Sequence, residues 1–110
     1  MNIQIWQVKR DVEDDIRRDL MCMDYEWVIQ RHENYIKNWK NYYSLMYEMY
    51  QDREPDETIS EVLKEIFYVF NNNDTPVPSD FKGHSLSMSD IVVIDEVPYY
   101  CDTFGWRIIE

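Results

Sequence analysis

The spacing of apolar side chains predicts a strand at the start of the chain and two helices after it. β-Branched and aromatic residues dominate residues 1–8, and both faces created by a period of two carry apolar side chains. Asp11 is placed to cap a helix that begins near Val12. From Tyr25 to Trp39 apolar residues recur at i, i+3, i+4 and i+7 without a break, which predicts one continuous second helix.

A second strand and a third helix are predicted in the middle of the chain. The apolar period changes to two over residues 43–50, which predicts a strand. One face of that strand is expected to carry Tyr43, Leu45, Tyr47 and Met49. Thr58 and Glu61 form a capping box, the pattern Ser/Thr-x-x-Glu that satisfies N–H groups at a helix start. The helix is expected to end in residues 71–74, whose Asn and Asp side chains tolerate left-handed backbone.

Three short strands are predicted in the last part of the chain. Residues 91–94 are apolar throughout, 95–98 form a turn, and 99–102 are the expected hairpin partner. Gly105 permits a further tight turn before a last strand over 106–109, which is a plausible sheet edge. The element order is therefore β-α-α-β-α-β-β-β, an α+β fold with about three helices and a mixed or antiparallel sheet.

Length and charge bound the class of protein. A chain of 110 residues suffices for one hydrophobic core, so residues 1–110 are expected to form a single domain. The 22 acidic and 11 basic residues give a formal net charge of -11, which repels free nucleic acid and anionic membranes. Residues 1–51 hold 9 acidic and 7 basic residues, whereas residues 52–110 hold 13 and 4. The second half is therefore the acidic part.

Cysteine usage and the absence of long apolar runs favour a cytoplasmic protein. Cys22 and Cys101 lie far apart without CxxC spacing, and both are expected to be small buried thiols. The first residues lack the basic start and apolar stretch of a secretory signal. No apolar run approaches the ~18 residues that a membrane-spanning helix needs. His32, on the apolar stripe of the second helix, is expected to be a hydrogen-bonded core or boundary residue.

One segment carries the residue types of nucleophilic or metal chemistry. Its candidates are Asp80, Phe81, Gly83, His84, Ser85, Ser87 and Asp90. The His, Ser and Asp side chains lie within seven positions, too close for the dispersed geometry of a catalytic triad. Their spacing also matches no compact metal-ligand motif. We expect a structural segment in which Gly83 permits a close approach and the serines bond the main chain, with no catalytic residue, no metal and no cofactor.

This segment and four others together resemble the YodL-like domain family. Residues 80–93 combine Gly-His, alternate serines and an apolar strand, and 99–106 follow with Tyr-Tyr-Cys-Asp-Thr-Phe-Gly-Trp. Residues 5–9 resemble the family's opening strand, 43–50 its Tyr-rich strand, and 62–71 its helix ending in Phe-Asn. The family occurs as small proteins and appended modules on mobile elements of Gram-positive bacteria. The resemblance implies an anti-defence or element-maintenance role in the host bacterial cell, and no enzyme activity.

Charge and resemblance lead to two functional hypotheses. In the first, an acidic interaction protein inhibits a host defence nuclease, such as type II CRISPR-Cas9 or a restriction enzyme, by occupying its basic nucleic-acid-binding surface. The candidate contact, here called the acidic strip, consists of Asp52, Glu54, Asp56, Glu57, Glu61 and Glu65. The alternative is a non-inhibitory docking or regulatory module of conjugative or phage machinery, using the C-terminal sheet or the Tyr-rich strand. Mimicry of nucleic acid should weaken steeply with salt, whereas aromatic docking should not.

Overall fold

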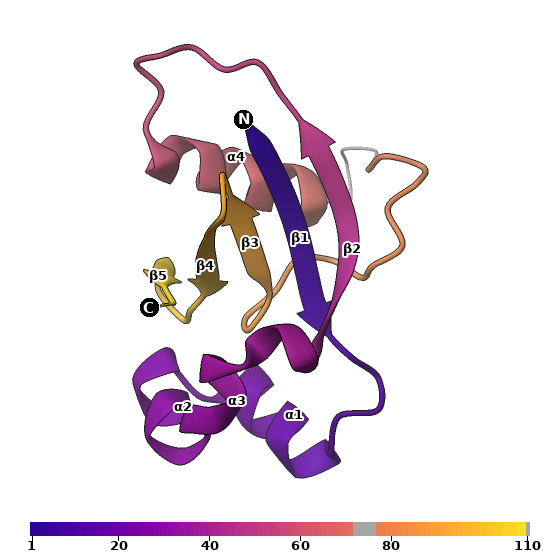
Figure 1. The fold of residues 1–110 in the computed structure, drawn as a ribbon, viewed down its shortest axis with the longest axis vertical. Coiled ribbons are helices and arrows are strands. Elements are labelled where there is room, and N and C mark those ends of the chain that lie inside the picture. The colour runs from indigo at the N-terminus through magenta and orange to yellow at the C-terminus, as the bar shows by residue number, and fades with distance from the viewer. Residues whose placement is uncertain (72–76, 110) are drawn as a thin grey trace.

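A five-stranded antiparallel sheet forms the centre of the molecule, with one long helix along one face and a group of shorter helices at one end of the sheet, packed on residues of the opposite face (Figure 1). The computed structural model describes residues 1–71 and 77–109. The elements are β1 (Asn2–Val8), α1 (Asp14–Cys22), α2 (Tyr25–Arg31), α3 (Glu33–Lys37), the 3₁₀ helix η1 (Trp39–Asn41), β2 (Tyr43–Tyr50), α4 (Ile59–Asn71), β3 (Ile91–Ile94), β4 (Val97–Cys101) and β5 (Trp106–Ile108). The α+β class and the predicted element order are confirmed.

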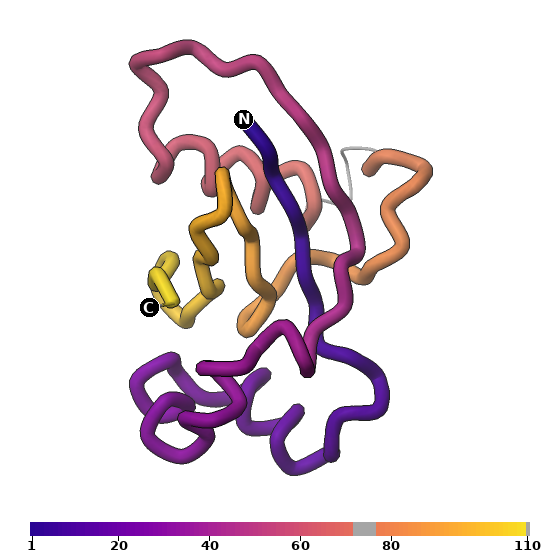
Figure 2. The backbone as a smooth tube through the Cα atoms, viewed as in Figure 1, coloured from indigo at the N-terminus to yellow at the C-terminus, as the bar shows by residue number. Residues whose placement is uncertain are grey.

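The strand order β2-β1-β3-β4-β5 places the N-terminal strand inside the sheet. The chain leaves β1, passes through α1 to η1, and returns beside it as β2 (Figure 2). It then crosses to α4 and comes back as β3 on the other side of β1. Strands β2 and β5 are the two edges, so the prediction of an edge at the C-terminal strand is confirmed. Pairing on both sides of β1 gathers the ends of the chain into one sheet.

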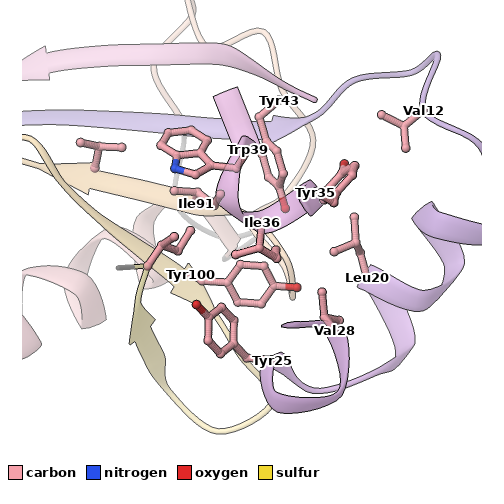
Figure 3. Packing of buried hydrophobic residues seen from close by; sticks show 12 residues of the cluster. Val12, Leu20, Tyr25, Val28, Tyr35, Ile36, Trp39, Tyr43, Ile91 and Tyr100 are labelled. Atoms are coloured by element: carbon pink, nitrogen blue, oxygen red, sulfur yellow. The ribbon is translucent and has the colours of Figure 1, made fainter. Parts of the chain in front are cut away.

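Side chains of β1 alternate between the two faces of the sheet and contribute to two separate hydrophobic clusters. Ile3 and Ile5 are fully buried beneath α4, which contributes Val62, Leu63, Ile66 and Phe70. Trp6 and Val8 point to the other face, where α1 to η1 pack. That second cluster is rich in aromatic rings and includes Tyr25, Tyr35, Trp39, Tyr43 and Tyr100 (Figure 3). Because successive strand residues face opposite sides, one strand supports both helical layers.

The prediction of one continuous helix from Tyr25 to Trp39 is wrong. The helix breaks at His32, whose φ of -130° and ψ of 45° are not helical, and the chain continues as α3 and η1. His32 Nε2 lies 2.9 Å from Asp19 Oδ2, as expected of a hydrogen-bonded boundary histidine. A straight helix of this length would extend about 22 Å. The break lets both Val28 and Trp39 reach the same cluster.

Two smaller predictions about the helical layer are also wrong. Helix α1 begins at Asp14 with Glu13 at its N-cap, so Asp11 does not cap it and Val12 precedes it. Val12 lies before the helix and is part of the hydrophobic cluster. Cys22, at the end of α1, is exposed rather than buried. It lies on the side of a short amphipathic helix whose buried residue is Leu20.

A β-bulge changes the faces predicted for β2. Ile5 pairs with Tyr47 while Trp6 pairs with Leu45, so Met46 has no partner residue on β1. The extra residue reverses the alternation along β2. Tyr47 and Met49 therefore pack beneath α4, whereas Tyr43 and Leu45 lie on the opposite face, and the single apolar face that we expected is divided.

The hairpin between β3 and β4 is tighter than predicted. Strand β4 begins at Val97, so the turn consists only of Asp95 and Glu96, with φ of 46° and 74°. Two-residue turns with positive φ match the right-handed twist of the strands that they join. Asp95 Oδ1 also accepts the Asn2 N–H at 2.8 Å, which ties the turn to β1. The predicted turn at Gly105 is confirmed by its φ of 85°.

The sequence predicts where α4 begins and where it ends. Thr58 Oγ1 accepts the Glu61 N–H at 3.2 Å, which confirms the predicted cap. The helix extends to Asn71. Of the expected helix end at 71–74, residues 72–74 lie outside the described residues.

Glu96→Gly is expected to raise the free energy of unfolding by about 0.5–1 kcal/mol. A left-handed conformation costs an L-residue about 1–2 kcal/mol, which glycine avoids. Glycine loses more backbone entropy on folding, so only part of this stabilisation remains. Urea unfolding measures the difference. Glu96→Ala is the matched control, because it removes the same charge but keeps the strain. An equal increase in the free energy of unfolding for both variants would show that the charge of Glu96, not its backbone geometry, destabilises this turn.

Candidate functional site

A buried glutamine fastens the 80–90 segment to β1. Gln7 is fully buried on the α4 side of the sheet. Its Nε2 donates to His84 O at 2.9 Å and to Asp90 Oδ2 at 3.0 Å, and its Oε1 accepts the His84 N–H at 3.1 Å. Both polar atoms of the amide are therefore used, as burial requires. Our sequence reasoning missed Gln7, although a polar residue in register with Ile3 and Ile5 was the available signal.

Asp90 is the second anchor of this network. Its Oδ2 accepts the Ser87 N–H at 2.9 Å as well as the Gln7 amide, and the residue is almost fully buried. Burial raises the pKa of the Asp90 carboxyl to about 7, against the opposing effects of the Ser87 hydrogen bond, nearby His84 and the Gln7 hydrogen bond. Ser89 adopts a φ of 75°, and its carbonyl accepts the Tyr43 hydroxyl at 2.6 Å. The network thus shapes a tight lead into β3.

Gly83 is required because the chain approaches Gln7 closely. A Cβ at this position would lie 2.1 Å from Gln7 Oε1 and 2.9 Å from Phe81 Cζ. Phe81 in turn packs edge-to-face on Phe70 of α4, with ring centroids 4.9 Å apart. The segment therefore connects the sheet with α4. Asp80 is exposed at its start.

The polar side chains of the segment do not form a reacting constellation. The Ser85 carbonyl can only accept, so His84 Nδ1, 2.8 Å away, is the protonated ring nitrogen in this contact. Ser85 is exposed, and Ser87 uses its backbone N–H and carbonyl to bond Asp90. Among residues 1–71 and 77–109, no group of three or more His, Cys, Asp or Glu side chains is placed to hold a metal. The arrangement serves to hold backbone in place.

The acidic strip lies along the loop before α4 and the start of that helix. Asp52, Glu54, Asp56, Glu61 and Glu65 are exposed, and Glu57 is partly buried. Arg53, whose side chain is only 10% exposed, lies among them. Its Nη1 is 3.3 Å from Glu57 Oε1 and 2.5 Å from Glu65 Oε2, and its Nη2 donates to Gln51 Oε1. One cation therefore joins the loop to α4.

The fold and this network define a small α+β domain whose sequence signature is structural. A family model for the YodL-like domain matches residues 2–110, and the chain belongs to that family. It is not a known enzyme family. Comparison with curated proteins gives no significant match, and comparison with solved structures gives none either. In the described parts of the chain, no helix is both long enough and apolar enough to cross a membrane.

Gly83→Ala is expected to lower the free energy of unfolding by about 2–3 kcal/mol, because the new methyl group displaces the Gln7 amide from its partners. Urea unfolding gives the loss, and the NMR signals of the Gln7 side-chain amide report the displacement. Gly105→Ala is the comparison variant. It has a positive φ but open space around it, so strain alone should cost about 1 kcal/mol. Equal losses at both positions would contradict the close-approach explanation.

Asp90→Asn is expected to change how stability depends on pH. The pKa of Asp90 is about 7 in the folded chain against an ordinary 3.8, so the folded state binds this proton more tightly. Stability from this group is therefore present below pH 4 and is lost as pH rises to 7, at about 1.4 kcal/mol per pKa unit. Urea unfolding between pH 4 and 8 should show that loss in the wild type and not in Asp90→Asn. The exposed Asp80→Asn serves as control and should follow the wild type; parallel profiles for all three would refute the assignment.

Proposed function

We propose that this chain is a non-enzymatic, acidic interaction protein of a mobile element. It acts in the cytoplasm of the host bacterial cell and inhibits a defence nuclease, type II CRISPR-Cas9 or a restriction enzyme. Inhibition comes from occupying a basic surface that otherwise binds nucleic acid. The observation that carries the proposal is the acidic strip, held in place by Arg53.

The Arg53 contacts make the strip a preorganised surface. The loop and the helix would otherwise move independently, and a partner would have to order them at an entropic cost. Arg53 neutralises charge at Glu57 and Glu65, but the other four carboxylates of the strip keep their exposure. Carboxylates spaced on a rigid surface can replace phosphates against Arg and Lys clusters. A rigid acidic surface is therefore better suited to compete with nucleic acid than a flexible acidic tail would be.

The uneven charge of the chain supports the same mode of action. Most of the net charge of -11 comes from residues 52–110, which include the acidic strip, so attraction steers a basic partner toward this part of the chain. Such steering raises association rates and is screened by salt. The same charge opposes direct binding of free nucleic acid.

The side chains of the 80–90 segment support a non-enzymatic role. The Gln7 amide bonds the backbone of His84 and the carboxylate of Asp90, so these contacts hold the chain in place. A general base or nucleophile needs a reacting atom within reach of substrate. The Asp90 carboxyl group is almost fully buried and does not meet this condition.

One observation favours the alternative of a non-inhibitory docking module in conjugative or phage machinery. Phe104 is 93% exposed on the turn that leads into β5, and an aromatic ring presented in this way suits an apolar pocket of a partner. Binding through Phe104 would depend little on salt, which separates the two functions experimentally.

Neutralising the free carboxylates of the strip is expected to abolish inhibition. The variant carries Asp52→Asn, Glu54→Gln, Asp56→Asn and Glu61→Gln and leaves the Arg53 contacts intact. Plasmid or phage protection is measured in bacteria that carry a defined Cas9 or restriction system. Wild type should protect, and the variant should lose at least about tenfold because several charge-assisted contacts disappear together.

The control removes the same number of charges from the helical layer, with Asp11→Asn, Glu13→Gln, Asp14→Asn and Glu33→Gln. These residues are also exposed. This control should protect as the wild type does. Equal loss in both variants would attribute the effect to net charge, and loss only in Phe104→Ala would favour the docking module.

A further inference from the structure

A groove lies on the sheet face opposite α4, where α1 to η1 leave part of β1 and β2 uncovered. Its volume is about 850 Å³. Residues of all four strands β1 to β4 line it, together with residues of η1 and of the β3–β4 turn. Figure 1 shows α1, α2 and α3 gathered beyond one end of the sheet, with the β3–β4 turn towards the other end. The groove is separate from the acidic strip and from the 80–90 segment.

A single carboxylate on the groove floor is oriented by a relay that begins in the hydrophobic cluster. Trp6 Nε1 donates to Gln4 Oε1 at 3.0 Å, which fixes the direction of the Gln4 amide. Gln4 Nε2 and Asn2 Nδ2 then donate to Glu48 Oε2, at 2.8 and 2.9 Å. These hydrogen bonds lower the pKa of Glu48, so the carboxylate stays ionised. Trp6 itself packs edge-on against Trp39, which holds the start of the relay.

The charge and shape of the groove select a cation of extended form. Glu48, Asp95 and Glu96 line it against one base, Lys40. Over the described residues no three such side chains converge on a metal-sized site, so the charges are spread along the groove. Tyr50, 78% exposed, adds an aromatic ring beside Glu48. A guanidinium group matches this combination, because it bonds carboxylates through two parallel N–H groups and stacks on aromatic faces.

We propose that this groove receives an arginine side chain from a basic surface of the protein partner. The proposal rests on the proposed function, in which the partner surface is basic. It adds the groove as a site that recognises one side chain of that surface. The acidic strip steers the partner by charge. The groove selects arginine over lysine, because an ammonium group lacks the planar fork and the ring stacking.

Lys40 contributes a positive charge to the lining of the groove. Its Nζ lies 5.7 Å from the centroid of the Trp39 ring, at the η1 end of the groove. An incoming arginine would be repelled by this positive charge. Removing the charge should therefore tighten binding, an effect opposite in sign to the loss of Glu48.

The test uses two capped tripeptides, acetyl-Gly-Arg-Gly-amide and its lysine counterpart, titrated into the 15N-labelled full chain. The arginine peptide is expected to shift the side-chain amides of Gln4 and Asn2 and the Trp6 indole N–H, with at least about threefold tighter binding than the lysine peptide. Glu48→Gln should weaken the arginine peptide by about fivefold, and Lys40→Gln should strengthen it. Glu13→Gln, at an exposed carboxylate outside both the groove and the acidic strip, should change neither affinity.

Three results would overturn the proposal: equal affinity for the two peptides, no effect of Glu48→Gln, or shifts confined to residues 52–65. The titration contains no defence nuclease, so it succeeds or fails independently of the protection assay. Protection that is lost in the strip variant and kept in Glu48→Gln would refute the groove as a partner contact while supporting the inhibitory function. Arginine-selective binding without protection against any nuclease would do the reverse.

Discussion

The structure depends on the side-chain amide of Gln7. Burying an amide without partners costs several kcal/mol, so its two polar atoms must be satisfied inside the protein. His84 and Asp90, more than 75 residues away in sequence, supply those partners. The same bonds place β3 beside β1, and they require Gly83 to lie against the amide. A network of this kind specifies one arrangement of segments, because a buried polar network with unsatisfied members is less stable than an apolar core.

The two faces of the sheet have different roles because β1 and β2 alternate between them. The α4 face is covered by apolar side chains and by the Gln7 network, in which both polar atoms of the buried amide have partners. The opposite face is covered only in part by α1 to η1, and its uncovered polar floor is where Glu48 lies. The bulge at Met46 decides this division, since it turns Glu48 and Tyr50 to the same side as Gln4 and Asn2.

Local pattern predicted the elements better than their relations. The strand at β1, the Thr58 cap and the Gly105 turn each depend on a few neighbouring residues, and each prediction is confirmed. The continuous helix through His32 failed because apolar spacing does not record where a helix must bend to meet a sheet. The prediction for the faces of β2 was wrong for a related reason. A bulge depends on how the strand pairs with β1, and the residues of β2 alone do not specify that register.

For the candidate sites, the sequence by itself determined the family, the element order and the excess of acidic residues. It also placed Gly83, His84 and Asp90 in one structural segment. Tertiary structure alone decided that Gln7 is their partner, that Arg53 joins the acidic strip to α4, and that Glu48 is oriented through Trp6. The physical reason is that these contacts form between residues separated along the chain, and only the packing of helices on a twisted sheet brings them within hydrogen-bond distance.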